Sequence, residues 1–215
     1  MALGNEWKRY IRLAEERPED FVQSDRLEIV WDEETVERFE KDSGRKIGVI
    51  YESDYHILVV DLVREGERIF AYERLLLKQS GAIVAIPRYK GKFILLRQYR
   101  HALRSGQYAF PRGFGEPGVS ALENVKKEIS EELGTQREAV HNIIHLGQVV
   151  ADSGVCGGCA DVFACDVEEW DVPVNYEGIL SALLLSENEF MEYIEAGKIN
   201  DGYTLSAFCL YKNIH

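Results

Sequence analysis

The feature that most constrains this chain is the stretch PRGFGEPGVSALENVKKEISEELG, residues 111–134. It opens as a loop rich in glycine and proline and continues as a segment crowded with glutamates. Ser120 followed by Glu123 has the spacing of a capping box, which predicts a helix beginning at Ala121. Gly134 is predicted to end this helix, because glycine readily takes the left-handed conformation that closes a helix.

The predicted helix has an apolar stripe and an acidic side. The stripe consists of residues that recur at helical spacing, namely Leu122, Val125, Ile129 and Leu133. The acidic side gathers Glu128, Glu131 and Glu132, because residues three or four apart are neighbours on a helix. A solvated acidic face is one interpretation. A set of oxygen ligands for a hard cation such as Mg²⁺ or Mn²⁺ is the other.

A basic segment precedes the acidic helix. No Asp or Glu lies between Glu73 and Glu116, although the whole chain has a formal net charge of -12. The overall charge argues against general nucleic-acid binding, which requires a basic face. The local segment favours a small anion instead. The predicted anion-binding residues are those that lead into the helix: Arg97, Arg100, Arg104 and Arg112.

The acidic helix and the basic segment together indicate phosphate chemistry. A cation held by the carboxylates would bridge to phosphate oxygens, polarise phosphorus and activate water. Arginines on the opposite side would stabilise the charge that develops. The combination predicts hydrolysis of a phosphate ester or a pyrophosphate.

At this point the stretch resembles a known family. It is similar to the Nudix box, Gly-x5-Glu-x7-Arg-Glu-U-x-Glu-Glu-x-Gly-U, where U is a bulky apolar residue. The positions that match are Gly113, Glu128, Ile129, Glu131, Glu132 and Gly134. The flanking segments SGAIVAIP, FILLRQYRHAL and YAFPRGFGEPG resemble those of ADP-ribose pyrophosphatase-type Nudix enzymes.

The resemblance implies roles for particular residues. Glu128, Glu131 and Glu132 match the family's metal-binding glutamates, and Glu131 and Glu132 would also be catalytic. The backbone carbonyl of Arg112 would add a metal ligand, and Gly113 would lie against the substrate. The implied cofactor is Mg²⁺ or Mn²⁺, and the implied substrate is a small nucleotide derivative related to ADP-ribose or a nucleotide sugar.

The chain departs from the family pattern in the box itself. Val119 stands at the place of the first glutamate and Lys127 at the place of the arginine that pairs with it. The paired change suggests a repacked support for the loop, with Glu116 compensating in part. Thr135 replaces the final bulky apolar residue.

A second departure lies in a later loop, DSGVCGGCADVF. Related pyrophosphatases often carry a further glutamate there, whereas the aligned position in this chain is Gly157 or Gly158. Asp152 and Asp161 are the nearby acids. The pair Cys156 and Cys159 has three open interpretations, a redox pair, half of a zinc site or a plain glycine-rich loop, and the last is preferred.

The fold class predicted for the chain is α+β, a Nudix fold in which a mixed sheet lies between helices. Helices are expected over residues 6–18, 186–199 and 202–213, and a short helix or a helical turn over residues 31–44, with strands in most of the remaining segments. The expected division is an N-terminal β-rich region over residues 1–78 and a Nudix domain over 79–215, with the boundary near Lys78 to Ser80. The resemblance implies that the first region helps to form a homodimer.

Other properties are expected from composition. Neither a signal peptide nor an apolar run long enough to span a membrane is recognised, so the predicted location is cytoplasmic, with no membrane partner. The four cysteines are then expected to be reduced. The leading hypothesis is a metal-dependent Nudix hydrolase. The alternatives are a Nudix-fold nucleotide sensor without turnover and a structural or partner-binding protein.

Overall fold

The fold is a computed structural model that describes residues 3–79, 81–116, 118–174 and 176–214. It divides into two compact units. The first comprises Met1–Lys78 together with Asp152–Gly158, and the second comprises Gln79–Ala151 and Cys159–His215. The segment Asp152–Gly158 was not part of the N-terminal region expected from the sequence. Ser80, at the expected boundary, lies outside the described residues.

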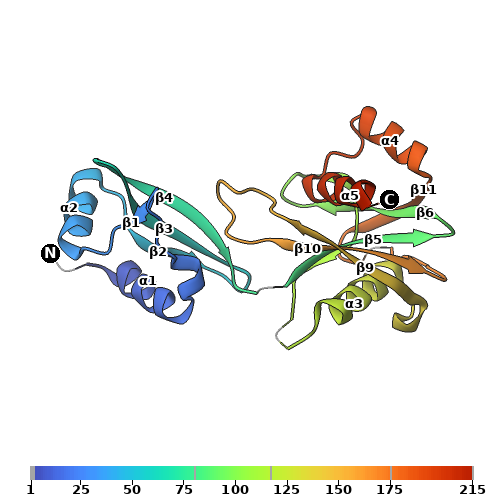
Figure 1. Cartoon of the computed structure of the whole chain (residues 1–215), viewed down its shortest axis with the longest axis horizontal. Coiled ribbons are helices and arrows are strands. Elements are labelled where there is room, and N and C mark those ends of the chain that lie inside the picture. Colours follow the sequence, from blue (N-terminus) through green and yellow to red (C-terminus); the bar gives the residue numbers. More distant parts are fainter. Residues whose placement is uncertain (1–2, 80, 117, 175, 215) are drawn as a thin grey trace. The chain divides into compact units, whose positions relative to one another are not determined.

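The first unit packs helices against an antiparallel sheet. Its helices are α1 (Asn5–Glu16), the short η1 (Pro18–Phe21) and α2 (Glu33–Ser43). Its strands are β1 (Glu28–Ile29), β2 (Gly48–Glu52), β3 (His56–Glu65) and β4 (Arg68–Leu77). β3 is central, with β4 on one side and β1 and β2 on the other (Figure 1).

Local signals explain the ends of these elements. The side chain of Asp32 accepts a hydrogen bond from the Thr35 backbone, and Gly44 ends α2 in the left-handed conformation with φ 71°. The turn between β3 and β4 forms around Gly66, which also has positive φ. The core of this unit includes a cluster of aromatic rings contributed by Trp7, Tyr10, Phe21 and Trp31.

Segment Asp152–Gly158 runs along the free edge of β4. The Leu75 backbone N–H donates to the Val155 carbonyl at 2.8 Å, and the Gly157 N–H donates to the Leu75 carbonyl at 3.0 Å. A Cβ at Gly157 or Gly158 would lie 2.8 Å from a leucine side chain of β4. These glycines therefore allow the close approach that covers an otherwise open sheet edge.

The second unit is built on a mixed sheet. Its strands are β5 (Ala82–Tyr89), β6 (Lys92–Arg100), β7 (Ser105–Ala109), β8 (Arg112–Gly113), β9 (Val140–Val149), β10 (Ala160–Val167) and β11 (Ile179–Leu185). In the described residues the order is β11-β6-β5-β10-β9, with β7 added to β6 and β8 added to β5. The β10–β5 pair is parallel and the other pairs are antiparallel.

Helices cover both faces of this sheet. α3 (Ala121–Leu133) lies on one face, and α4 (Glu187–Glu195) and α5 (Gly202–Ile214) lie on the other (Figure 1). A second short 3₁₀ helix, η2 (Arg137–Ala139), follows α3. The apolar side chains of β6 alternate between the two cores, so Phe93 and Leu95 face α4 and α5 whereas Ile94 and Leu96 face α3.

The predicted α+β class, with a mixed sheet between helices, is confirmed. The four predicted helices are confirmed to within a few residues. Strands β1, β7, β8 and β11 were not predicted individually, because β1 and β8 have two residues each and β7 is rich in polar residues. None of the helices in the described part of the chain is long and apolar enough to cross a membrane.

Candidate active site

Helix α3 begins and ends where its sequence predicts. The Ser120 hydroxyl accepts the Glu123 backbone N–H at 3.3 Å, and Gly134 closes the helix with φ 67°. The apolar stripe is confirmed for the fully buried side chains Val125, Ile129 and Leu133. Leu122 is a correction, because half of its side chain is exposed at the first turn, outside the core.

Glu132 is the most deeply buried carboxylate of the helix, with only 3% of its surface exposed. The Gln98 side-chain amide donates to it at 3.0 Å, and the Arg112 backbone N–H donates at 3.2 Å. Burial raises the pKa of Glu132 to about 7, although the Gln98 hydrogen bond acts in the opposite direction. A carboxyl group with this pKa changes charge near neutral pH.

Glu128 lies one turn earlier, directly against the loop glycine. A Cβ at Gly113 would overlap the Glu128 carboxylate, so only glycine permits this contact. Burial raises the pKa of Glu128, and the charge of Lys127 opposes that rise. Gly113 therefore lies beside the acidic helix and leaves room for the Glu128 carboxylate.

Lys127 stands among the remaining carboxylates. Its ammonium group lies 2.8 Å from Glu116, 3.6 Å from Glu128 and 3.7 Å from Glu131. The hydrogen bond with Glu116 is the main cause that raises the pKa of Lys127. Val119 is 40% exposed, and Glu116, the acid expected to compensate for it in part, pairs with Lys127.

Two arginines lie close to Glu132. The Arg112 guanidinium pairs with Asp201 at 2.9 Å and lies over the Tyr203 ring at 5.0 Å. Arg100 is largely buried, and its Nε and Nη2 atoms have no hydrogen-bond partner among the described residues. Burial and the neighbouring charge of Arg112 lower the pKa of Arg100, whereas Glu132 and Asp201 raise it. Arg100 is thus a buried cation with free donors.

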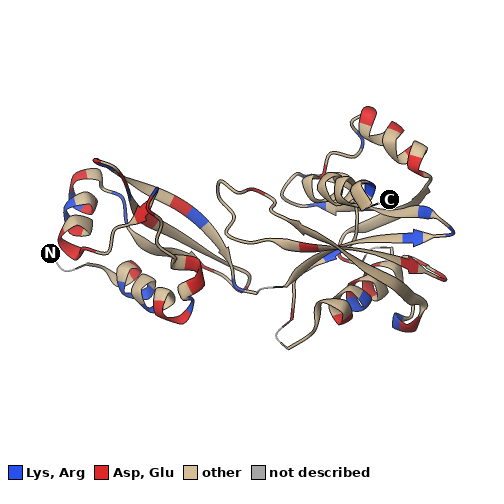
Figure 2. Ribbon diagram, viewed as in Figure 1, with Lys and Arg blue, Asp and Glu red and all other residues tan. Residues whose placement is uncertain are grey.

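The other two predicted arginines are not brought to the helix. Arg97 lies on the face of β6 that continues Leu95, opposite to α3, and its guanidinium lies 6.0 Å from the Tyr108 ring centre. Arg104 is exposed on the turn between β6 and β7, where it contacts His101. Figure 2 shows the basic character of β5 and β6, on which no Asp or Glu occurs.

Sequence reasoning missed two residues of this site. Gln98 is 2% exposed and holds Glu132 in place. The sequence signal that could have identified Gln98 is a polar residue at an inward-facing position of β6, where the other inward residues of the buried part are apolar. Asp201 accepts from the Thr204 backbone at 2.9 Å at the start of α5 and pairs with Arg112, 89 positions away in the sequence. No local sequence pattern predicts this ion pair.

The acids of the later loop have other partners. Asp152 lies in the first unit and accepts the Gly154 backbone N–H at 2.9 Å. Asp161 lies on β10, 2.8 Å from His145. Cys156 and Cys159 are free thiols in the loop between β9 and β10.

The site offers donors of the type that a divalent cation binds. In the described residues no three acidic, histidine or cysteine side chains converge closely enough to hold a metal ion. The carboxylates of Glu128 and Glu132 are nevertheless desolvated, and a positive charge already lies within 4 Å of Glu128 and Glu131. Oxygen ligands with this excess of negative charge suit Mg²⁺ or Mn²⁺.

Comparison with known proteins agrees with this geometry. A family model described as the NUDIX domain matches residues 77–192, which is more than half of the chain. A crystal structure described as an ADP compounds hydrolase is similar with a TM-score of 0.63 and 16% identity, over 77% of this chain and 89% of that one. At this identity the likeness concerns the fold. A comparison with curated proteins gave no match.

Proposed function

This chain belongs to the NUDIX family of pyrophosphohydrolases, and we propose that it hydrolyses the pyrophosphate bond of a nucleoside diphosphate derivative of the ADP-ribose or nucleotide-sugar type. The observation that carries the proposal is that two buried groups of opposite charge lie close together. Glu132 is a buried carboxylate that accepts two hydrogen bonds. Near it lies Arg100, whose Nε and Nη2 atoms are buried and have no hydrogen-bond partner among the described residues. Unsatisfied buried donors are costly unless a ligand completes them.

The acidic residues of α3 are proposed to hold the metal ion. Glu128, Glu131 and Glu132 would be its side-chain ligands, and the Arg112 carbonyl would add a backbone ligand. When bound, Mg²⁺ or Mn²⁺ supplies Lewis-acid polarisation of phosphate and lowers the pKa of water. Gln98 and the Arg112 N–H keep the Glu132 carboxylate oriented, since each donates to a different oxygen.

Arg100 is proposed to bind the phosphate groups. Its free N–H donors form a fork that matches two phosphate oxygens, and its burial strengthens each charge-assisted hydrogen bond. Asp201 and Tyr203 hold the Arg112 side chain beside it, so two positive charges are fixed on this side of the site. Arg97 and Arg104 would act only if the substrate reached beyond the α3 face of the sheet.

A hydrolysis panel tests the proposal. The purified protein is incubated with ADP-ribose, nucleotide sugars, diadenosine polyphosphates and nucleoside triphosphates, with Mg²⁺ or Mn²⁺. We expect cleavage of the ADP-ribose or nucleotide-sugar class, and a loss of about 100-fold or more in kcat/KM in Glu132→Gln, equivalent to about 2.7 kcal/mol.

Glu123→Gln is the matched control on the same helix. Glu123 is exposed and its carboxylate lies 3.8 Å from Lys126, so the variant removes one acidic charge without touching the site. It should retain wild-type activity. Equal activity of wild type and Glu132→Gln on every substrate would remove the glutamate helix from the reaction.

A second candidate function is a Nudix-fold nucleotide sensor with little or no turnover. Lys127 favours it, because an ammonium group among three carboxylates supplies the positive charge that a cation would otherwise bring. A nucleotide that raises the melting temperature of the protein without any metal-dependent product would support the sensor. Gain of hydrolysis in Lys127→Arg, the residue of the family pattern, would show that Lys127 limits catalysis.

Two further properties are proposed, the first on the resemblance and the second on the composition of the chain. The N-terminal region, residues 1–78, would contribute to a homodimer, and the protein would act in the cytoplasm. Analytical sedimentation of the purified chain tests the homodimer, for which a mass near twice 24.6 kDa is expected. Fractionation of the cells that produce it gives the second.

A further inference from the structure

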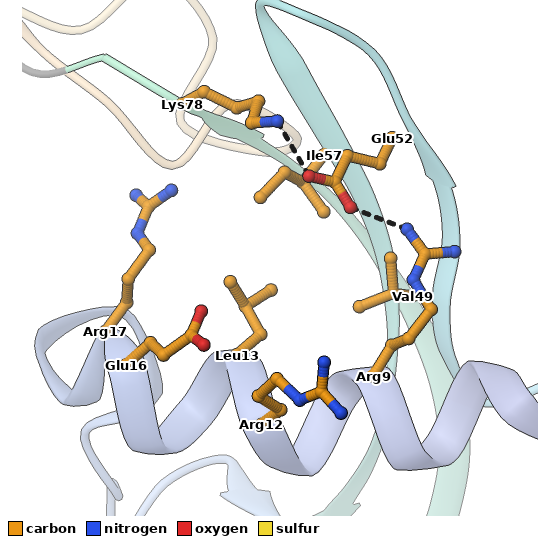
Figure 3. A pocket seen from close by; sticks show the side chains of 9 residues that line it. All are labelled: Arg9, Arg12, Leu13, Glu16, Arg17, Val49, Glu52, Ile57 and Lys78. Carbon is orange, nitrogen blue, oxygen red and sulfur yellow. Dashed lines mark hydrogen bonds and ion pairs between the residues drawn. The ribbon is translucent and has the colours of Figure 1, made fainter.

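A pocket of about 340 Å³ lies in the first unit, lined by α1, β2, β3 and the residue that follows β4 (Figure 3). Its size falls at the lower end of the range that holds small organic ligands. Leu13, Val49 and Ile57 give it an apolar surface. None of its lining residues belongs to the candidate active site.

The charged side chains of the pocket are predominantly basic. They are Arg9, Arg12, Arg17, Lys78, Glu16 and Glu52. The lining therefore has a formal charge of +2, in a protein whose net charge is -12. Such a local concentration of positive charge favours a small anion over a neutral ligand.

Three of the cations are held in place by neighbouring groups. Glu52 lies 2.6 Å from Arg9 and 2.7 Å from Lys78, between the two (Figure 3). Arg17 donates to the Leu77 carbonyl at 2.8 Å and pairs with Asp20. The Glu52 pairs are about one-third exposed, and ion pairs of this kind contribute little stability, so an incoming anion can share these cations at small cost.

Arg12 is different from the other three. No described residue forms an ion pair or a hydrogen bond with its guanidinium group, and Arg12 lines the pocket from α1 (Figure 3). Its planar fork of N–H donors matches the oxygens of a phosphate. It lies next in sequence to Leu13, so a charged donor and an apolar surface are adjacent in the same pocket.

We propose that this pocket binds the phosphate monoester of a small organic molecule, a sugar phosphate or a nucleoside monophosphate. Such an ester carries about -1.5 to -2 charges at pH 7, which complements the charge of the lining. Its several oxygens accept from Arg12 and Arg17 in charge-assisted hydrogen bonds. Its organic part lies on Leu13, Val49 and Ile57.

Calorimetric titration of the full chain tests this site. The probes are ribose 5-phosphate, adenosine monophosphate, inorganic phosphate and the unphosphorylated ribose and adenosine, all with a chelator present. At least one monoester should bind, more tightly than inorganic phosphate, and the unphosphorylated compounds should not. Arg12→Ala should weaken binding about tenfold, the factor expected for one lost charge-assisted hydrogen bond.

Two variants make the result specific. Arg26→Ala removes an exposed arginine of the same unit outside the pocket and should bind as wild type does. Arg100→Ala alters the candidate active site and should leave this binding unchanged. The proposal is overturned if Arg12→Ala binds as tightly as wild type, if inorganic phosphate binds as tightly as the monoesters, or if binding disappears in Arg100→Ala instead. Loss of hydrolytic activity alone would bear only on the proposed function.

Discussion

Each unit of the molecule buries a carboxylate, and the two carboxylates differ in the groups that donate hydrogen bonds to them. In the first unit Asp61 is 2% exposed and receives two hydrogen bonds from Arg74 and one from Tyr10. In the second unit Glu132 is 3% exposed, and the hydrogen bonds that described residues donate to it come from neutral groups, the Gln98 side-chain amide and the Arg112 backbone. A buried charge costs free energy unless it is paired.

The difference lies in the partners of the two carboxylates, because Asp61 has a guanidinium group as a hydrogen-bond donor and Glu132 has neutral donors. Burial alone would lower the pKa of Arg74, but its hydrogen bond with Asp61 and the charge of Asp61 raise it, so Arg74 keeps its positive charge. Burial raises the pKa of Glu132 to about 7, because the hydrogen bond from Gln98 and the charge of Arg100 offset the loss of water only in part. A carboxyl group whose pKa is strongly shifted by burial is a candidate for a functional role.

The largest expected effect on stability comes from removing Arg74, the cationic partner of the buried Asp61. Arg74→Met leaves Asp61 buried without its cation, which should lower the free energy of unfolding by about 3–5 kcal/mol. Urea unfolding followed by the fluorescence of Trp7 and Trp31 in the same core measures it. Arg68→Met is the matched control on β4, where an exposed arginine lies over Phe70, and should cost at most about 1 kcal/mol. A small effect of both variants would mean that Asp61 does not require its partner.

The second prediction concerns how the free energy of unfolding depends on pH. Because the pKa of Glu132 is raised from 4.5 to about 7, the folded protein binds more protons than the unfolded chain between these values. Stability of the metal-free protein should therefore fall as pH rises through this window, by up to roughly 3 kcal/mol from this group. Glu132→Gln should remove that fall, whereas Glu123→Gln should keep it. Identical pH profiles of unfolding for wild type and Glu132→Gln would contradict the assignment.

A third variant tests the close contact that keeps Glu128 desolvated. Gly113→Ala places a methyl group where the Glu128 carboxylate lies, and the displacement should cost about 1–3 kcal/mol. Gly202→Ala is the control, because a Cβ there meets no atom within 4 Å. Thermal unfolding of the two variants under the same conditions gives the comparison. Equal melting temperatures would show that Glu128 rearranges freely.

The smallest effect concerns a neutral group. Thr135 is 3% exposed, and its hydroxyl has no hydrogen-bond partner among the described residues. Thr135→Val should raise the free energy of unfolding by about 1 kcal/mol, because it removes an unsatisfied buried hydroxyl. Thr204→Val should lower it, since that buried hydroxyl donates to Asp201 at 2.8 Å and accepts from the Phe110 backbone at 3.0 Å. Urea unfolding measures both changes, and a loss of stability in Thr135→Val would contradict the prediction.

Much of the fold could be predicted from local patterns. The boundaries of α2 and α3 follow from their caps and closing glycines, and β4 and β6 match the predicted segments. The two-residue strands and β11 were missed, because their pairing depends on partners distant in the chain. The candidate site was predicted in part. The helix, its glutamates and Gly113 come together, whereas Arg97 and Arg104 lie elsewhere.

The residues themselves determined that a capped helix would present three glutamates after a glycine-rich loop, since helical spacing and capping are properties of neighbours in the chain. Only the tertiary structure decided that Glu132 is buried while Glu131 remains partly exposed, and that Arg100 rather than Arg97 faces α3. It also decided that Glu116 pairs with Lys127 and that Asp201 pairs with Arg112. Burial and charge pairing depend on which distant segments pack together, and no short-range pattern encodes that.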